Sequence, residues 1–225
     1  MFLYYVTDRK QLSADPEKSI QLLLERIRLA AEAGVDAIQL REKDLSAREM
    51  TNLGLRAMEV VNKINASRTP KTQTHVLINS RVDVAVACGC DGVHLRSDDI
   101  SAADARAVLI QAGIKQPLVG VSCHSVAEVE QAYGHGADFV VLGPVFAKSG
   151  AEKPIGLALI SSVVKSLGDR ALPVLALGGV TLDNAAACME AGAAGVAGIR
   201  LFQSGNVRET VSRLRSLKHD WIKCP

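Results

Sequence analysis

Apolar positions follow two patterns along this chain, and the two patterns alternate. Short, nearly continuous apolar runs predict buried strands, and longer segments with apolar residues at every third or fourth position predict amphipathic helices. The predicted strands are residues 2–6, 35–40, 75–78, 92–95, 117–121, 138–142, 173–177 and 195–199. The predicted helices end near residues 33, 65, 88, 111, 134, 167, 191 and 217, so that one helix follows each strand. At residue 46 a Ser precedes a Glu by three positions, which is typical of a helix capping box.

A repeated pattern marks the entry into every second strand. Gly34, Gly89, Gly136 and Gly192 each stand two residues before an Asp or Ala, and an apolar strand follows. These glycines lie 47 to 56 residues apart. A unit of that length holds two strands and two helices, so the repeat indicates an array of strand–helix modules.

Eight strand–helix units predict a single (β/α)8 TIM barrel spanning residues 1–225. Parallel strands need crossover connections, and strands that are apolar throughout are buried on both faces, which places the helices outside the ring. The alternative is an open, doubly wound sheet. Such a sheet rarely needs eight strands, and residues 7–10 after the first strand, Thr-Asp-Arg-Lys, lack the glycine-rich phosphate-binding sequence typical of it.

Composition excludes several classes of function. The chain has 225 residues, of which 48% are hydrophobic and 4% aromatic, enough for a large aliphatic core. Its net charge is +2 without blocks of like charge, so we expect no nucleic-acid or membrane partner. No apolar run is as long as a membrane span and no signal peptide is recognisable, so we expect a cytoplasmic protein. The five cysteines lack CxxC spacing, and we predict neither a disulfide nor a zinc site. The sequence leaves open whether the protein is a homo-oligomer.

The carboxyl end of the second strand carries a basic cluster. Active sites of TIM barrels lie at the carboxyl ends of the strands. Because side chains alternate along a strand, Gln39, Arg41 and Lys43 share one face, and Leu40 and Glu42 point to the other. Two cations and an amide on one face can hold a polyphosphate. The alternative interpretation is a solvated strand end with an Arg–Glu pair.

Glycines at the end of the seventh strand predict a second anion site. Gly178 and Gly179, together with a helix that begins after the eighth strand, match the phosphate cup common in this fold. Gly198, Ile199 and Arg200 offer a further candidate beside it. The alternative is a tight left-handed turn that needs glycine for conformational reasons. The other polar residues at strand ends are Asp8, Arg9, Asn79, His94, Asp98, Asp99, Ser122, His124 and, in a long loop after the sixth strand, Lys148 and Lys153.

Taken together, these motifs resemble the thiamine phosphate synthases and the related thiazole tautomerases. The resemblance covers nearly the whole chain and is carried by residues 5–9, 39–43, 77–79, 91–95, 120–125, 143–146 and 177–185. As a synthase, the protein would join a hydroxymethylpyrimidine pyrophosphate to a thiazole phosphate and release pyrophosphate. The resemblance thus implies small phosphorylated substrates.

The resemblance also implies roles for individual residues. Asp99, with Asp98, would ligate Mg²⁺ as the cofactor. The catalytic candidates are Arg41, Lys43, Ser122 and His124. The substrate-binding candidates are Gln39, Arg41, Lys43, Asn79, Ser122, Lys148, Gly178, Gly179, Gly198, Ile199 and Arg200. Gln39, Arg41, Lys43 and Asn79 would hold the pyrophosphate, and Gly179 with the loop after the eighth strand would hold the thiazole phosphate.

Four positions depart from the synthase pattern. Ser80 stands where the synthases usually have Asp, Arg96-Ser97 replaces Gly-Gln, residues 147–150 replace Thr-x-Thr-Lys, and Arg200 replaces Ser. Losing an anionic oxygen at residue 80 weakens a site for a hard cation. A tautomerase would tolerate these changes, because proton transfer on a thiazole carboxylate phosphate needs no Mg²⁺, and His124 would then be its acid–base residue. A non-catalytic binder of thiamine precursors is the third hypothesis. We expect His94 to be a hydrogen-bonded core residue.

Overall fold

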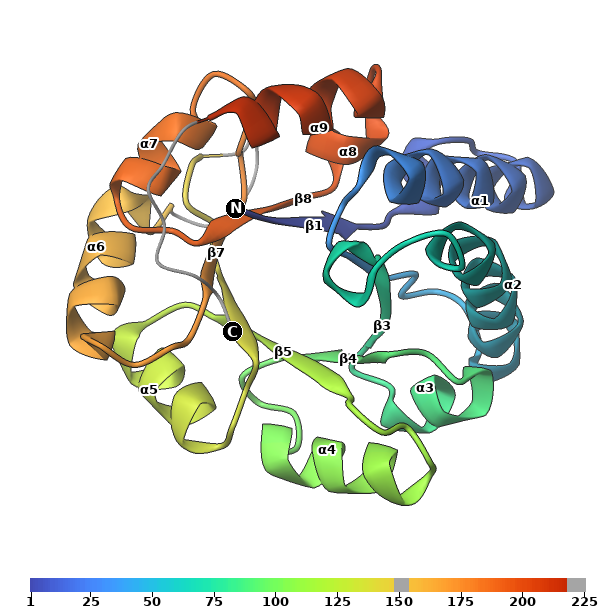
Figure 1. Cartoon of the computed structure of the whole chain (residues 1–225), viewed down its shortest axis with the longest axis horizontal. Helices are drawn as coiled ribbons and strands as arrows, with labels where there is room; N and C mark the ends of the chain where they lie inside the picture. Colours follow the sequence, from blue (N-terminus) through green and yellow to red (C-terminus); the bar gives the residue numbers. More distant parts are fainter. Residues whose placement is uncertain (148–153, 218–225) are drawn as a thin grey trace.

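Eight parallel strands form a closed ring in the computed structural model, which describes residues 1–147 and 154–217. Each strand pairs with its neighbours in chain order, and β8 pairs with β1 to close the ring. The strands are β1 (Phe2–Val6), β2 (Ala37–Leu40), β3 (His75–Asn79), β4 (Gly92–Leu95), β5 (Leu118–Cys123), β6 (Phe139–Leu142), β7 (Val174–Leu177) and β8 (Gly195–Gly198). The helices surround this ring (Figure 1). The predicted (β/α)8 barrel is confirmed, and the open sheet is wrong.

The helices follow the predicted order with one addition. They are α1 (Pro16–Ala33), α2 (Ala47–Asn65), α3 (Val82–Cys88), α4 (Ala102–Gln111), α5 (Val126–Gly134), α6 (Gly156–Leu167), α7 (Ala185–Glu190), α8 (Arg200–Gln203) and α9 (Val207–Ser216), with short 3-10 helices at Arg9–Gln11 and Pro70–Thr72. Ser46 and Glu49 form the predicted capping box of α2. The four-residue α8 escaped prediction because one turn shows no periodicity. No helix in the described part of the chain combines the length and apolarity of a membrane span.

The repeated Gly-x-Asp pattern ties neighbouring strands together. Oδ2 of Asp36, Asp91 and Asp138, each just before an even-numbered strand, accepts a hydrogen bond from the main-chain N–H of Leu3, Val76 and Val119, respectively, in the preceding strand, at 2.6 to 2.7 Å. The glycine two residues earlier has a positive φ in each unit, which ends the helix and turns the chain back to the sheet. In the fourth unit Ala194 replaces the Asp and offers no such side-chain acceptor, but its carbonyl accepts the N–H of Phe2 in β1, just as the carbonyls of Asp36 and Asp91 accept from the strand that follows. The repeat therefore fixes the register at the amino-terminal end of the barrel.

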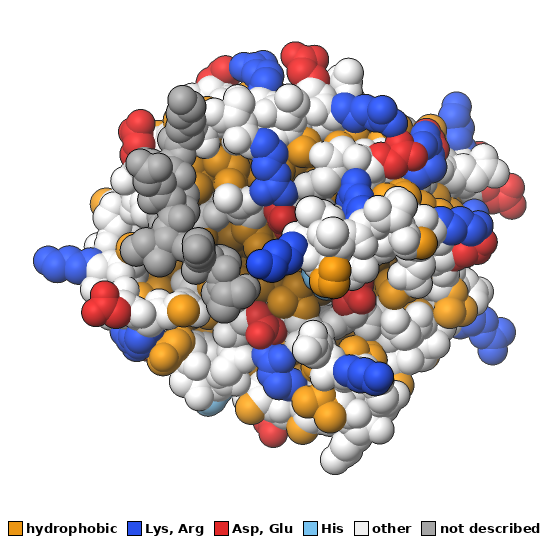
Figure 2. Space-filling view, viewed as in Figure 1, with side chains coloured by type: hydrophobic (Ala, Val, Ile, Leu, Met, Phe, Trp, Pro, Cys, Tyr) orange, Lys and Arg blue, Asp and Glu red, His pale blue; other side chains and the backbone are white. Residues whose placement is uncertain are grey.

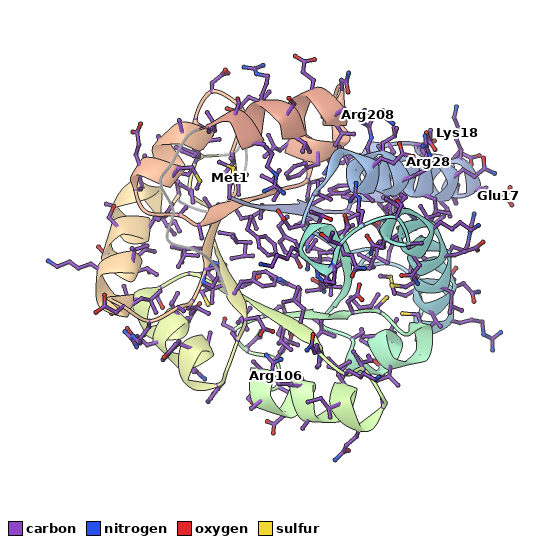
Figure 3. All side chains as sticks on the ribbon, viewed as in Figure 1. Met1, Glu17, Lys18, Arg28, Arg106 and Arg208 are labelled. Carbon is purple, nitrogen blue, oxygen red and sulfur yellow. The ribbon has the colours of Figure 1, made fainter. Side chains whose placement is uncertain are left out.

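Side chains fill the barrel interior, as Figure 3 shows. Inward positions alternate with positions that face the helices, and the inward layer contains Tyr4, Val6, Ala37, Leu77, Phe139, Val141, Leu175 and Ala197. The ring of Phe139 stacks on Phe2 at 5.3 Å between centroids and meets the ring of Tyr4 edge-on at 5.1 Å. Because this aromatic cluster packs the interior, we expect ligands to bind at the mouth of the barrel and not along its axis.

Polar contacts reinforce the seam between the first and last strands. The side-chain amide of Gln203 in α8 donates to the carbonyl of Asp8 at 2.9 Å and accepts the N–H of Asp8 at 2.8 Å. On the outside, Glu32 of α1 pairs with Arg208 of α9 and with Arg28, both labelled in Figure 3. The Gln203 contacts hold the loop after β1 beside the loop after β8, and both loops border the candidate site.

Candidate active site

A cavity of about 920 Å³ lies at the carboxyl ends of the strands, where the predicted site residues meet. Its lining includes Gln39, Arg41, Lys43, Asn79, His94, Arg96, Asp98, Ser122, His124, Gly178 and Ile199. Seen along the barrel, the surface is hollowed near the axis, with apolar side chains at depth and Lys, Arg, Asp and Glu around the opening (Figure 2). A concave site of this volume, with a few convergent polar groups, suits a small charged ligand.

The basic cluster after β2 has the alternation that the sequence predicted. Gln39, Arg41 and Lys43 line the cavity, and Glu42 is buried on the opposite side. Gln39 Nε2 donates to Asn79 Oδ1 at 2.8 Å, which orients both amides at the floor of the site. In residues 1–147 and 154–217, neither the Arg41 guanidinium nor the Lys43 ammonium has a hydrogen-bond partner. Both cations are therefore available to a bound anion.

A buried polar cluster behind the cavity fixes this strand end. Glu42 Oε1 accepts the hydroxyl of Thr7 at 2.6 Å, and Glu42 Oε2 accepts the main-chain N–H of Arg9 at 3.0 Å. The Arg9 guanidinium also donates to both oxygens of Asp44, at 2.7 and 2.8 Å. This fork holds the pKa of Asp44 well below its usual range. Thr7 Oγ1 in turn accepts the N–H of Arg41 at 3.0 Å. The cluster therefore fixes the main-chain position of Arg41 just after β2.

His94 lies between the barrel core and the cavity. Its Nδ1 is 3.1 Å from the hydroxyl of Tyr4, and its Nε2 is 2.8 Å from Oγ of Ser122. Burial, with a smaller effect of the Arg41 charge, lowers the pKa of His94 to about 3. The imidazole is therefore neutral near pH 7 and donates through only one nitrogen. The expectation of a hydrogen-bonded core histidine is confirmed, and the ring orients the Ser122 hydroxyl at the floor of the cavity.

The low pKa of His94 predicts an acid-sensitive fold. Unfolded histidine titrates near pH 6.5. As the pH falls below that value, the unfolded chain binds a proton that folded His94 excludes until about pH 3, so stability decreases. We expect the free energy of unfolding to fall by about 2 kcal/mol from about pH 7 to about pH 5 through this residue. Urea unfolding of the wild type and of His94→Gln, which cannot titrate, measures the difference. The exposed His135→Gln is the control, and equal pH slopes in all three proteins would refute the assignment.

His124 is held in a defined tautomer at the edge of the cavity. Its Nδ1 lies 2.6 Å from the carbonyl oxygen of Gly143, which can only accept, so Nδ1 carries the proton. Its main-chain N–H donates to Glu128 at 2.7 Å. Nε2 then presents a lone pair, which is what a general base or a hydrogen-bond acceptor for a ligand requires.

The glycine cup forms a second cavity of about 310 Å³ that adjoins the first. Both cavities are lined by Leu177, Gly178 and Ile199, and the second is also lined by Gly179, Gly198 and Arg200. Gly179 has φ +67°, and a Cβ there would lie 2.7 Å from Cβ of Phe146. Both the backbone conformation and the close packing therefore demand glycine at this position. The cup and the basic cluster thus belong to one mouth.

The acidic pair lies at the opposite edge of the mouth but divides between two cavities. Asp98 lines the large cavity, and Asp99 lines a neighbouring one of about 60 Å³. The guanidinium of Arg96 pairs with both, with Nε 3.3 Å from Asp98 Oδ1 and an Nη 3.2 Å from Asp99 Oδ1. Burial opposes ionisation of Asp99, but hydrogen bonds from Arg96 and Ser80 outweigh it and leave the pKa of Asp99 below its usual range.

Asp98 and Asp99 are the candidate ligands for Mg²⁺ at this mouth. Mg²⁺ is usually held by one or two carboxylates together with substrate phosphates. Asp98 and Asp99 supply two carboxylates, and within the described ranges no three His, Cys, Asp or Glu side chains form a metal-binding group. The residues therefore fit an ion that arrives with a phosphorylated ligand, and they do not form a metal cage of their own.

The structure brings most predicted site residues to this mouth. The exceptions are Asp99, which faces the smaller cavity, and Lys148, which lies outside the described residues. Sequence reasoning noted Arg96 only as a departure from a family pattern and did not include it in the site. The sequence contained a signal for Arg96, because it follows directly on a barrel strand and stands just before two acids, a position at the carboxyl ends of the strands where active sites lie.

Comparisons with known proteins agree with this geometry. A family model described as thiamine monophosphate synthase matches residues 3–202. The thiamine-phosphate synthase of Roseiflexus castenholzii is 38% identical over 198 residues, covering 87% of this chain and 78% of the relative. That of Methanoculleus marisnigri is 36% identical over 192 residues, covering 84% of each chain. The solved structure of the thiamine phosphate pyrophosphorylase from Pyrococcus furiosus superposes with a TM-score of 0.75 at 29% identity, covering 96% of this chain and 94% of that one.

Proposed function

The chain belongs to the thiamine monophosphate synthase family, and from this premise we propose that it joins a hydroxymethylpyrimidine diphosphate to a thiazole phosphate, giving thiamine phosphate and pyrophosphate. One observation carries the proposal. A single barrel mouth contains a basic cluster whose two cations have no partner among residues 1–147 and 154–217 and, directly beside it, a separate glycine cup. The two substrates carry a diphosphate and a phosphate, so each has a matching site.

The basic cluster binds the leaving group in this proposal. Arg41 and Lys43 contact the diphosphate, and the paired amides of Gln39 and Asn79 orient it from below. When the bond between the methylene carbon and the diphosphate oxygen breaks, its electron pair goes to the diphosphate. The negative charge on that group grows in the transition state, and fixed cations in a partly enclosed site stabilise such charge. Ser122, oriented by His94, lies next to the pyrimidine.

The glycine cup positions the nucleophile. Main-chain N–H groups at Gly178 and Gly179 and the guanidinium of Arg200 bind the thiazole phosphate. Because the two cavities share Leu177, Gly178 and Ile199, the thiazole nitrogen is held near the cationic pyrimidine methylene, where it forms the new C–N bond. Holding two reactants in one mouth is itself a large part of such catalysis.

Mg²⁺ is part of the proposal. Asp98 and Asp99 would hold it once the diphosphate is bound, and the ion would supply positive charge to the leaving group.

An assay with purified protein tests the function. Incubation with both substrates and Mg²⁺ is expected to give thiamine phosphate and an equal amount of pyrophosphate. The same mixture without the thiazole phosphate is expected to give no thiamine phosphate. Tight binding of both substrates with no product would contradict the transferase and favour a non-catalytic binder.

A thiazole tautomerase is the second candidate, favoured by the tautomer of His124. His124 lines the mouth, and with a proton on Nδ1 the Nε2 atom of the neutral ring can act as a base. Such a base could move a proton on a thiazole carboxylate phosphate seated in the cup. Isomerisation of that compound in EDTA, lost in His124→Asn, supports the tautomerase. Absence of isomerisation with synthase activity intact excludes it.

A further inference from the structure

We propose that Arg96 is a diphosphate-binding residue that allows this chain to hold the leaving group without a metal ion. The inference rests on the proposed function for the identity of the ligand. Arg96 lines the same cavity as Arg41 and Lys43 but approaches from the loop after β4, next to the acidic pair. Three cations therefore surround the space in which the diphosphate would lie.

The contacts of the Arg96 guanidinium are those of a loosely held group. Its distances to Asp98 and Asp99 are 3.2 to 3.3 Å, longer than the 2.7 and 2.8 Å of the Arg9–Asp44 fork. Strong charge-assisted hydrogen bonds fall at about 2.7–2.9 Å. The Arg96 side chain is also 64% exposed, and exposed ion pairs contribute little to stability. A diphosphate can therefore take over guanidinium N–H groups from the carboxylates at small cost.

The loop does not depend on this guanidinium for its shape. The main-chain N–H of Arg96 donates to Asp99 Oδ2 at 2.8 Å, and the N–H of Asp99 donates back to the carbonyl of Arg96 at 3.2 Å. Both bonds survive truncation of the Arg96 side chain. A variant at this position should therefore fold, and its binding properties can be measured directly.

The charge balance of the site also favours a direct contact. Asp98 shares the cavity with Arg41 and Lys43. An unmasked carboxylate here would repel a diphosphate unless a cation stood between them, and among the described residues Arg96 is the cation that contacts Asp98. The guanidinium has five N–H donors, so when no ion is present it can bridge the acids and the diphosphate. Arg96 thus fills the position between acid and phosphate that a divalent ion would otherwise fill.

Calorimetric titration with inorganic pyrophosphate in EDTA tests the proposal. Arg96→Ala is expected to weaken binding by about 10- to 100-fold, because hydrogen bonds to charged groups contribute about 1.5–3 kcal/mol. Arg81→Ala is the matched control, since Arg81 also pairs with a nearby acid, Asp83, but does not line the cavity. The control should bind as the wild type does.

A second background separates direct binding from charge masking. In Asp98→Asn/Asp99→Asn there is no acid to mask, so Arg96→Ala should still cost about tenfold or more if the guanidinium contacts the diphosphate. The proposal would be overturned if Arg96→Ala weakened binding only when Asp98 and Asp99 are both present. It would also be overturned if Arg96→Ala left the affinity unchanged, or if the wild type did not bind pyrophosphate in EDTA. Because these titrations need no turnover, they stand apart from the assay of the transferase. If the transferase assay gave no product but the pyrophosphate titrations gave the expected affinities, the proposed reaction would be refuted and the role of Arg96 would stand.

Discussion

Replacing Arg41 by alanine is expected to lower kcat/KM for the diphosphate substrate by about 100- to 1,000-fold, because removal of one fixed group that stabilises transition-state charge typically costs that much. The Arg41 guanidinium lines the cavity without a partner in the described part of the chain, so nothing in the fold compensates for its loss. Most of the effect should appear in kcat, since the charge on the leaving group grows as the bond breaks. The folded state should be little affected.

Steady-state kinetics with Arg41→Lys and Arg48→Ala gives the comparison. Lysine keeps the charge but not the fork, so an intermediate loss is expected. Arg48 is exposed near the start of α2, away from the cavity, and its removal should leave the rate unchanged. A wild-type rate for Arg41→Ala would show that the diphosphate is held elsewhere.

Replacing Glu42 by alanine is expected to destabilise the fold by about 3–5 kcal/mol, as removal of one partner of a buried ion pair does. Glu42 and Arg9 are only 6% and 7% exposed. Without Glu42, the Thr7 hydroxyl and the Arg9 main-chain N–H lose their acceptors, and Asp44 is the one acidic partner left to Arg9 in the described part of the chain. Since Thr7 also positions the N–H of Arg41, activity should fall together with stability.

Urea unfolding followed by circular dichroism measures this prediction. Glu42→Gln can still accept from Thr7 and should lose less than Glu42→Ala. Glu59→Ala removes an exposed carboxylate that pairs with Lys63 on α2, and its effect should stay within about 0.5 kcal/mol. Equal stabilities for Glu42→Ala and Glu59→Ala would mean that the buried cluster is not an anchor.

The fold was predictable because hydrophobic periodicity and the repeat agree. The Gly-x-Asp pattern gave the entry to β2, β4 and β6, and the structure explains it by hydrogen bonds from Asp36, Asp91 and Asp138 to the preceding strands. Boundaries were less accurate. β2 begins at Ala37 and not at residue 35, because the side chain of Asp36 accepts the main-chain N–H of Leu3 in β1 just before the strand starts. β5 continues to Cys123, since pairing with Leu142 extends it beyond the apolar run.

The part of the site that comes from a single strand was predictable from the sequence. Period-two alternation placed Gln39, Arg41 and Lys43 together, because local geometry decides which way each side chain points. Contacts between strands were not predictable in the same way. The Gln39–Asn79 pair, the chain from Tyr4 through His94 to Ser122, and the position of Arg96 between Asp98 and Asp99 depend on how separate loops meet. No spacing within a single strand encodes these contacts.

The arrangement of the mouth separates its two tasks along the chain. The cationic wall comes from the segments around β2 to β4, whereas the phosphate cup comes from those around β7 and β8. Mutation or recombination in the carboxyl-terminal quarter could therefore change which nucleophile is accepted while the leaving-group machinery is inherited intact. A barrel divided in this way is a natural starting point for directed evolution toward new heterocyclic acceptors.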